Sequence, residues 1–161
     1  YIHKITDELN QTQAISSTSS TISALLNSKK LICDDNKIAF DTQLDFNNIY
    51  INDFTLITVL GNILDNAITA ASKLDNGYIN LAIKQADTYL AIHCENNHHE
   101  KIKKREGRFI SSKPSSGSKA NPLHGLGLIS VTNNVNKYGG TIDINYNDTT
   151  FIVDILIPNY R

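Results

Sequence analysis

The sequence lacks long apolar runs, an excess of one charge and closely spaced cysteines. No stretch approaches the roughly 18–20 apolar residues that span a bilayer, and residues 1–4 lack the apolar character of a signal peptide. The 15 basic and 16 acidic residues give a net charge of −1, so charge gives no reason to expect nucleic acid or an anionic membrane as a partner. Methionine is absent. We therefore expect a fragment or a processed product, which membrane segments can precede in the parent protein.

The two cysteines, Cys33 and Cys94, are far apart and have no metal-ligand spacing. We expect both to be small buried residues in a reducing compartment, rather than partners in a disulfide. The length of 161 residues fits one ordinary domain. Hydrophobic and charged fractions of 40% and 19% support a packed core.

The N-terminal region has a helical pattern that ends in a polar break. Ile2, Ile5, Leu9 and Ile15 recur at roughly helical intervals, which predicts the end of a helix entering from upstream. The Ser/Thr-rich stretch 16–21 interrupts this pattern, and its hydroxyl groups suit a helix cap.

The rest of the chain predicts a two-layer α+β sandwich, with a mostly antiparallel sheet of about five strands packed on about three helices. Strands are expected where apolar residues alternate, and helices where they recur at helical intervals. The expected helices cover residues 22–33, 54–73 and 128–138, and the expected strands cover residues 38–44, 79–83, 90–94, 142–146 and 151–157. The second helix is very apolar, which indicates that it is largely buried, and Asn52 suits its N-cap.

Residues 97–123 differ in kind from the rest. They are rich in Lys, Ser, Gly, Pro and Asn and have almost no periodic apolar residue. A loop of this length in a compact domain is usually a functional lid or a disordered segment. The adjacent His98 and His99 could suggest a metal site, but histidines on a polar loop are usually solvated, and we expect that here.

Two polar motifs contain asparagine. Asn62 and Asn66 are four residues apart on the apolar helix, so they lie on one face of it. There they either bond to neighbouring loops or ligate a hard cation such as Mg²⁺. Asn96 ends a strand, where its carboxamide either starts a turn or matches the edge of adenine.

The third motif is His124-Gly125-Leu126-Gly127-Leu128, which leads into a helix. Its glycines allow the backbone to approach a ligand, and a helix start presents free N–H groups to phosphate. The motif is neither a Walker A sequence nor a dinucleotide fingerprint. A lone GxG is also common in ordinary turns.

Together the three motifs resemble the GHKL ATPase superfamily, named for gyrase, a heat-shock chaperone, histidine kinases and MutL. The order of asparagine helix, polar strand end, long lid, glycine motif, helix and closing hairpin is similar to that fold over residues 20–158. Within the superfamily the chain most resembles sensor histidine kinases, particularly those that detect peptide pheromones. The segments that carry this likeness are LGNILDNAITAA (60–71), FISSK (109–113), HGLGLISV (124–131) and NKYGG (136–140).

The resemblance implies a site for ATP and Mg²⁺. Asn66 would ligate a Mg²⁺ ion that bridges the ATP phosphates, and Asn62 would line the same pocket. Asn96 stands where many relatives have an Asp that accepts a hydrogen bond from the adenine amine. Residues 124–128 would close on the phosphates beneath the lid, and Lys113 would either reach a phosphate or stay solvated.

Asn62 also distinguishes two branches of the superfamily. Members that hydrolyse ATP resemble one another in a Glu four residues before the metal-binding Asn, and that position is Asn62 here. An amide cannot accept a proton from an attacking water as a carboxylate does. The resemblance therefore implies transfer of the γ-phosphoryl group of ATP to a histidine, with Asn62 at the catalytic position, rather than rapid hydrolysis.

The resemblance also implies a division of the chain and a set of partners. Residues 1–19 would be the end of a dimerisation helix with its linker, and residues 20–161 the catalytic domain. The partners would be the dimerisation and phosphoacceptor domain, which this sequence lacks, and a response regulator. The parent would be a homodimer in the cell membrane, with this domain in the cytoplasm.

Two departures from the pattern keep alternatives open. The first glycine box is absent, because Asn96-Asn97-His98-His99 stands in its place, and no histidine has the neighbours of a phosphoacceptor. A degenerate module that binds nucleotide or docks a partner without kinase activity is one alternative. A serine kinase of an anti-sigma system is another.

Overall fold

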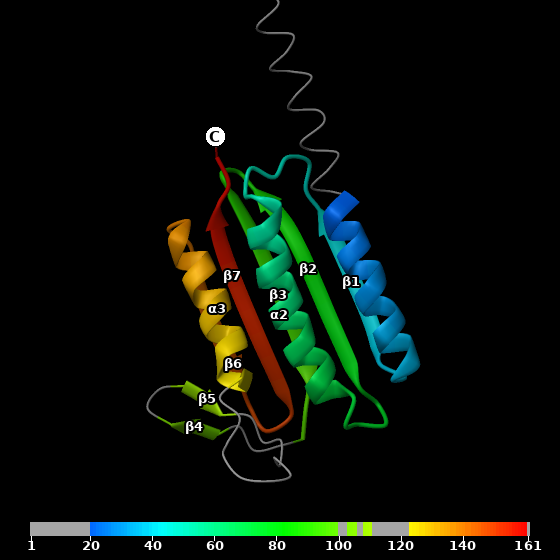
Figure 1. Cartoon of the computed structure of the whole chain (residues 1–161). Helices are drawn as coiled ribbons and strands as arrows, with labels where there is room; N and C mark the ends of the chain where they lie inside the picture. The colour runs from blue at the N-terminus through cyan, green and yellow to red at the C-terminus, as the bar shows by residue number, and fades with distance from the viewer. Residues whose placement is uncertain (1–19, 100–102, 106–107, 111–122, 161) are drawn as a thin grey trace, which may run out of the picture.

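The computed structural model describes residues 20–99, 103–105, 108–110 and 123–160 (Figure 1). The chain forms a helix at residues 20–35, β1 Ala39–Asp45, α2 Asp53–Ala71, β2 Tyr78–Ala86, β3 Tyr89–Asn97, β4 Lys103–Arg105, β5 Arg108–Ile110, α3 Leu123–Lys137, β6 Thr141–Tyr146 and β7 Thr150–Pro158. The helical pattern expected for residues 2–15 lies outside the described residues.

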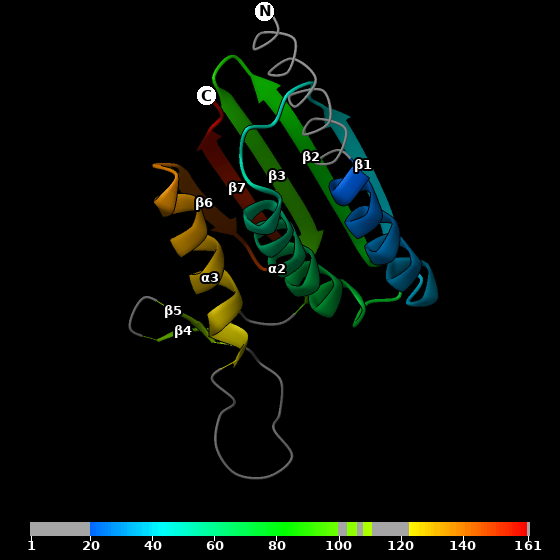
Figure 2. The same ribbon diagram turned by 45° about the horizontal axis from the view of Figure 1, so that its top comes forward.

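Five strands form one sheet in the order β1-β2-β3-β7-β6 (Figure 2). β1 is parallel to β2, since α2 crosses over between them, and the other neighbouring strands are antiparallel. The helix of residues 20–35, α2 and α3 all cover one face of this sheet (Figure 1). β4 and β5 pair with each other in a separate sheet. The expected two-layer α+β sandwich is confirmed.

α2 is the central helix of the core. Asn52 caps it as predicted, because Asn52 Oδ1 accepts a hydrogen bond from the Thr55 N–H at 3.0 Å. By length and composition this helix of 19 residues could span a membrane, contrary to the expectation from the sequence. However, half of its apolar stretch is buried inside the described fold. Its apolar character therefore serves packing on the sheet.

α3 ends at two glycines, as predicted. Gly139 has a φ of 70°, and the N–H groups of Gly139 and Gly140 donate to the carbonyl oxygens of Asn136 and Val135 at 2.9 and 3.0 Å. This is the Schellman arrangement, in which a left-handed residue closes the helix. A Cβ at Gly140 would lie 2.6 Å from the Leu156 carbonyl oxygen, which is too close for any side chain. Glycine is therefore required where the chain turns from α3 into β6.

Alternation of apolar residues predicted a strand at residues 38–44, yet Leu44 at its end is 45% exposed, because β1 is an edge strand. The outer side of α2 also exposes Phe54 and Ile57, since no third layer covers the helices. Cys33 and Cys94 are free and buried, as expected. Burial raises the pKa of both thiols, that of Cys94 to about 12.

A buried asparagine near the C-terminus joins three segments, and no pattern in the sequence indicated it. Asn159 is 3% exposed. Its Nδ2 donates to the Asn48 carbonyl oxygen and its Oδ1 accepts from the Tyr50 N–H, both at 2.7 Å. Its backbone N–H donates to the Thr88 carbonyl oxygen at 2.6 Å. The loop that leads from β1 into α2 is thereby held against the end of β7.

Replacing Asn159 by alanine should destabilise the fold. The substitution removes the side-chain hydrogen bonds to the Asn48 carbonyl oxygen and the Tyr50 N–H, and such a loss costs about 1–3 kcal/mol. We expect the free energy of unfolding in a urea titration to fall by about that amount. Asn80→Ala, at an exposed position on β2, should change it by less than about 0.5 kcal/mol. Equal losses in the two variants would show that the Asn159 bonds do not hold this loop.

Candidate functional site

The sequence motifs meet at one end of the molecule. The second half of α2, the start of α3 and the end of β3 lie together at that end, beside the β4–β5 hairpin (Figures 1 and 2). α2 contacts both α3 and β3, and α3 contacts β5. The fold therefore gathers the asparagine pair, the glycine motif and the asparagine at the strand end from distant parts of the chain.

Gly127 lies where α3 meets the asparagine pair. A Cβ at Gly127 would be 3.2 Å from Asn62 Oδ1 and 3.7 Å from Asn66 Nδ2. A side chain at residue 127 would therefore require the Asn62 amide to shift by a few tenths of an ångström. Asn62 and Asn66 thus face α3 from one side of α2, in agreement with their four-residue spacing. We call this arrangement the amide junction.

The two amides of the junction differ in their hydrogen bonds. Asn62 Nδ2 donates to the Thr58 carbonyl oxygen at 2.7 Å, which fixes the orientation of the side chain. Asn66 makes no side-chain hydrogen bond to any other described residue. It is only partly buried, so its polar atoms can be reached. The Asn66 amide is therefore available to a ligand.

The glycine motif lies inside a helix, not in a loop before one as expected. α3 begins at Leu123, so residues 124–128 form its first turns. The expected helix began at Leu128, whereas α3 begins five residues earlier, and its buried row runs through Leu128, Val131 and Val135. The N–H groups of the first turn have no partner within the helix, and the positive end of its dipole lies at this end of the molecule.

Asn96 is 3% exposed and lies on the helix-covered face of β3. Its Nδ2 donates to the Asn97 carbonyl oxygen at 3.0 Å. Because a carbonyl oxygen can only accept, this bond settles which end of the amide is the amine. Asn96 Oδ1 has no partner among the described residues. The described residues contain no fully buried side-chain oxygen or nitrogen that lacks a partner, so Asn96 Oδ1 is not an orphaned buried acceptor.

Asn97 holds the end of β3 in place, a role that the sequence analysis missed. Its Oδ1 accepts from the Tyr78 N–H at 2.8 Å, and its Nδ2 donates to the Asn76 carbonyl oxygen at 2.9 Å. The Tyr78 hydroxyl group donates to Glu95 at 2.8 Å. Burial and this hydrogen bond raise the pKa of Tyr78. These contacts tie the strand end to the loop that follows α2.

His98 is buried, which corrects the expectation of two solvated histidines. It is 6% exposed. Its backbone N–H donates to the Thr149 carbonyl oxygen at 2.9 Å, and its Nε2 donates to the Asn147 carbonyl oxygen at 3.0 Å. His99 is exposed, as expected. The local pattern could not indicate the burial of His98, because its partners lie in the turn between β6 and β7.

Part of the expected lid is a hairpin. β4 and β5 pair with Lys104 opposite Phe109, whereas no strand was expected in residues 97–123. The two limits of that range belong to β3 and α3. Lys113 lies outside the described residues.

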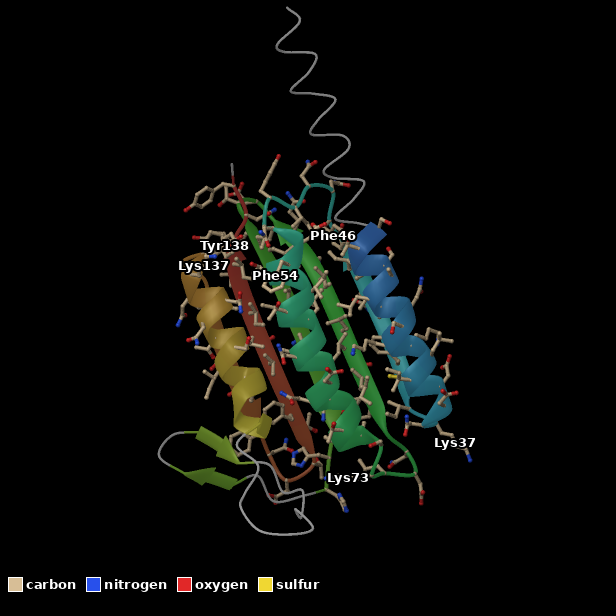
Figure 3. All side chains as sticks on the ribbon, in the orientation of Figure 1. Lys37, Phe46, Phe54, Lys73, Lys137 and Tyr138 are labelled. Carbon is tan, nitrogen blue, oxygen red and sulfur yellow. The ribbon has the colours of Figure 1, made fainter. Side chains whose placement is uncertain are left out.

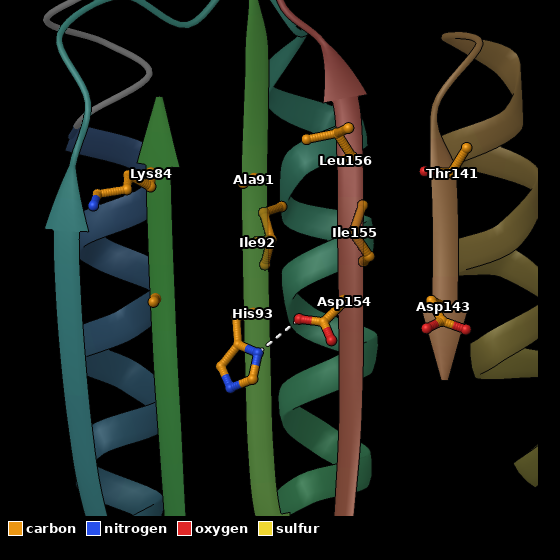
Figure 4. A pocket seen from close by; sticks show the side chains of 10 residues that line it. Lys84, Ala91, Ile92, His93, Thr141, Asp143, Asp154, Ile155 and Leu156 are labelled. Carbon is orange, nitrogen blue, oxygen red and sulfur yellow. Dashed lines mark hydrogen bonds and ion pairs between the residues drawn. The ribbon is translucent and has the colours of Figure 1, made fainter. Parts of the chain in front are cut away.

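A separate hollow of about 390 Å³ lies on the opposite, open face of the sheet (Figure 4). Its lining includes Lys84, His93, Asp143 and Asp154. His93 Nδ1 bonds to Asp154 Oδ1 at 2.7 Å, and Asp143 accepts from Asn145 Nδ2 at 2.8 Å. Both carboxylates in the hollow therefore already have partners. None of the three sequence motifs contributes to it, so the amide junction is the stronger candidate site.

Comparison with known proteins gives a family match and several similar folds. The family model described as the GHKL domain matches residues 51–158. The catalytic domain of histidine kinase ThkA is 19% identical, with a TM-score of 0.66 over 88% of this chain and 91% of that chain. Acinetobacter baumannii histidine kinase AdeS is 17% identical, with a TM-score of 0.63 over 99% of this chain and 81% of that chain.

The mycobacterial sensor histidine kinase MprB has a similar fold as well. It is 19% identical, with a TM-score of 0.61 over 86% of this chain and 95% of that chain. No curated protein matches the chain by sequence. At these identities the solved structures establish a shared fold.

Gly127→Val should disturb the amide junction. The valine side chain would have to displace the side-chain amides of Asn62 and Asn66. Overpacking of this kind typically costs about 1–3 kcal/mol, and we expect the free energy of unfolding to fall by about that amount. Gly61→Val is the matched control on α2, because a Cβ there would meet no atom within 4 Å. It should leave stability unchanged or slightly higher, since valine has a better helix propensity than glycine. If urea unfolding gives the same value for both variants, the close approach at Gly127 is not a constraint.

Proposed function

The chain belongs to the GHKL family, and from this membership we propose that it is the ATP-binding catalytic domain of a sensor histidine kinase. In this proposal the domain transfers the γ-phosphoryl group of ATP to a histidine on a dimerisation domain elsewhere in the parent protein. The observation that carries the proposal is the amide junction, where Asn62 and Asn66 face Gly127.

The residues at the junction fit a triphosphate with a bound cation. Asn66 offers an amide without a partner among the described residues, and the first turn of α3 offers N–H groups that favour phosphate. Within the described ranges, no group of three or more His, Cys, Asp or Glu residues could hold a metal ion alone. Asn66 would instead hold a Mg²⁺ ion whose shell is completed by phosphate oxygens and water. When bound, such an ion neutralises charge on the transferred phosphoryl group.

Asn96 supports recognition of adenine. Its Nδ2 is engaged by the Asn97 carbonyl oxygen, so its Oδ1 is the group left for a ligand. The adenine amine is a donor, whereas guanine presents a carbonyl oxygen at the equivalent position. An acceptor at Asn96 therefore favours ATP over GTP. A carboxylate here would face the Asn97 carbonyl oxygen, which gives a physical reason for Asn rather than the Asp of many relatives.

Asn62 favours phosphoryl transfer over hydrolysis. Its Nδ2 is held by the Thr58 carbonyl oxygen, and an amide cannot remove a proton from water. ATP bound at the junction would therefore persist until a histidine side chain is presented to it. Positioning and charge neutralisation are the main requirements of phosphoryl transfer, and the first turn of α3 and Asn66 contribute to both.

The proposal extends to the parent protein. Residues 1–19 would be the end of the dimerisation helix with its linker, and residues 20–161 the catalytic domain with a nucleotide lid at about 97–123. The parent would be a homodimeric membrane receptor of the peptide-pheromone type, which passes its phosphoryl group to a response regulator. The domain would lie in the cytoplasm. Sequence upstream of Tyr1 that lacks both hydrophobic spans and a His-Asp or His-Glu motif would refute this extension.

A docking module without kinase activity is the second candidate, and His98 favours it. The first glycine box is absent, and the buried His98 within the segment that replaces it is bonded to the turn between β6 and β7. Under this alternative the fold holds nucleotide, or none, and acts by docking a partner without transferring a phosphoryl group. Measured affinity for Mg·ATP distinguishes the two functions.

Asn66→Ala should weaken binding of Mg·ATP. We expect the wild-type chain to bind with a dissociation constant in the micromolar range or weaker, because the first glycine box is incomplete. Loss of the Asn66 oxygen should raise that constant at least tenfold, which is about 1.4 kcal/mol. Asn133→Ala, at an exposed position on α3, should bind like wild type. Isothermal titration in the presence of Mg²⁺ measures all three, and unchanged binding in Asn66→Ala would remove this residue from the site.

The isolated chain should neither hydrolyse ATP appreciably nor label itself. It has no base at position 62 and no histidine with phosphoacceptor neighbours. With radiolabelled ATP it should label the dimerisation segment when that segment is added as a separate polypeptide, although slowly, because the effective concentration of a tethered partner is lost. Asn62→Glu should raise hydrolysis modestly by restoring a base. Tight ATP binding without any labelling of the added segment would favour the docking module.

A further inference from the structure

An asparagine that reads a nucleobase can do so in two orientations, whereas an aspartate cannot. The two ends of the carboxamide are similar in size, but the oxygen accepts hydrogen bonds and the nitrogen donates them. With Oδ1 presented to the ligand, Asn96 would accept from the adenine amine. With Nδ2 presented, it would donate to a carbonyl oxygen at the same place of the base. The contacts that orient this amide therefore decide which purine the site accepts.

One peptide group orients the Asn96 amide. Asn96 Nδ2 donates to the Asn97 carbonyl oxygen at 3.0 Å. The N–H of the same peptide group belongs to His98 and donates to the Thr149 carbonyl oxygen at 2.9 Å. Because a peptide group is planar, the bond on its N–H side also restrains the direction of its carbonyl oxygen. We call this group the 97–98 peptide.

Side chains on both sides anchor the 97–98 peptide. On one side, Asn97 Oδ1 accepts from the Tyr78 N–H at 2.8 Å, and Asn97 Nδ2 donates to the Asn76 carbonyl oxygen at 2.9 Å. On the other side, His98 Nε2 donates to the Asn147 carbonyl oxygen at 3.0 Å. The first anchor lies in the loop after α2, and the second lies in the turn between β6 and β7.

The turn between β6 and β7 is closed by its own hydrogen bonds. Asn147 Oδ1 accepts from the N–H groups of Thr149 and Thr150 at 2.9 and 2.8 Å, which is an Asx turn. The Asn147 N–H also donates to the Thr150 carbonyl oxygen at 3.0 Å. The turn lies at the same end of the molecule as Lys73, which follows α2 (Figure 3). His98 is therefore bonded to a turn that is fixed independently of the 97–98 peptide.

We propose that Asn97 and His98 are positioning residues that act through the 97–98 peptide, keep Asn96 Oδ1 directed to the base and so make the site specific for adenine. The role rests on the proposed function, because it requires a purine nucleotide at Asn96. It also gives a physical reason for the absence of the first glycine box. A glycine at position 97 or 98 has no side chain and would supply no anchor.

Inosine triphosphate separates a change of orientation from general damage to the site. Its base presents a carbonyl oxygen where adenine presents an amine, as guanine does. In His98→Leu one anchor is lost, so the 97–98 peptide can move away from Asn96 Nδ2 and the amide can turn. We expect the dissociation constant of Mg·ATP to rise and that of Mg·inosine triphosphate to fall. Their ratio should change roughly threefold to tenfold, which is what one hydrogen bond contributes.

Two variants serve as controls in the same titrations. In His98→Gln the side-chain amide can still donate to the Asn147 carbonyl oxygen, so this variant should keep the wild-type ratio. His99→Leu makes the leucine substitution at the neighbouring exposed position and should keep the ratio as well. A ratio that changes as much in His99→Leu as in His98→Leu would overturn the role of His98.

Asn97→Ala removes the anchor on the other side of the 97–98 peptide. It should change the ratio in the same direction as His98→Leu, because both substitutions release the same carbonyl oxygen. Damage to the fold alone would weaken both nucleotides by a similar factor. If both nucleotides are weakened equally in His98→Leu and Asn97→Ala, the proposal is wrong, although the proposed function stands as long as the wild-type chain binds Mg·ATP.

Solvent exchange of the Asn96 side-chain amide gives a readout that needs no nucleotide. Followed by nuclear magnetic resonance of the ¹⁵N-labelled chain, its protons should exchange at similar rates in the wild type and His98→Gln. In His98→Leu they should exchange roughly threefold to tenfold faster, because the bond to the Asn97 carbonyl oxygen opens more often. Equal rates in the wild type and His98→Leu would show that the anchor does not orient Asn96. A wild-type chain that binds neither nucleotide would refute both the proposed function and the specificity for adenine.

Discussion

The close approach of α3 to α2 is the contact on which the candidate site depends. Asn62 and Asn66 face α3 at Gly127, where a Cβ would lie 3.2 Å from Asn62 Oδ1 and would press on that amide. A glycine weakens the helix that contains it. The fully buried Val131 and Val135 offset this loss by anchoring α3 in the core. The contact that packs α3 against α2 therefore also brings Gly127 to Asn62 and Asn66 at the candidate site.

β3 supplies the second fixed point of the site. Asn97, the last residue of β3, bonds to the loop after α2. The next residue, His98, bonds to the turn between β6 and β7. Asn96, which precedes these two residues, is buried on the helix-covered face of β3. The sheet thus separates two environments. Its covered face carries the site, whereas the open face carries the hollow where His93 pairs with Asp154.

Local patterns predicted the features that depend on neighbours in sequence. The cap at Asn52, the alternation in β2 and β3 and the shared face of the asparagine pair all follow from helix or strand geometry. Features that depend on distant contacts were missed. His98 is buried where its side chain donates a hydrogen bond to the Asn147 carbonyl oxygen, and Asn159 is buried where it bonds to the loop before α2. The glycine motif was expected in a loop because the helix is stabilised by core contacts that no local window contains.

The location of bound nucleotide tests the central claim most directly. Backbone amide signals of the ¹⁵N-labelled chain can be followed by nuclear magnetic resonance while Mg·ATP is added. The account predicts shifts that saturate together at Asn62, Asn66, Asn96 and Gly127, with little change around the open-face hollow at His93. Saturable shifts centred on His93, with the amide junction unaffected, would contradict it.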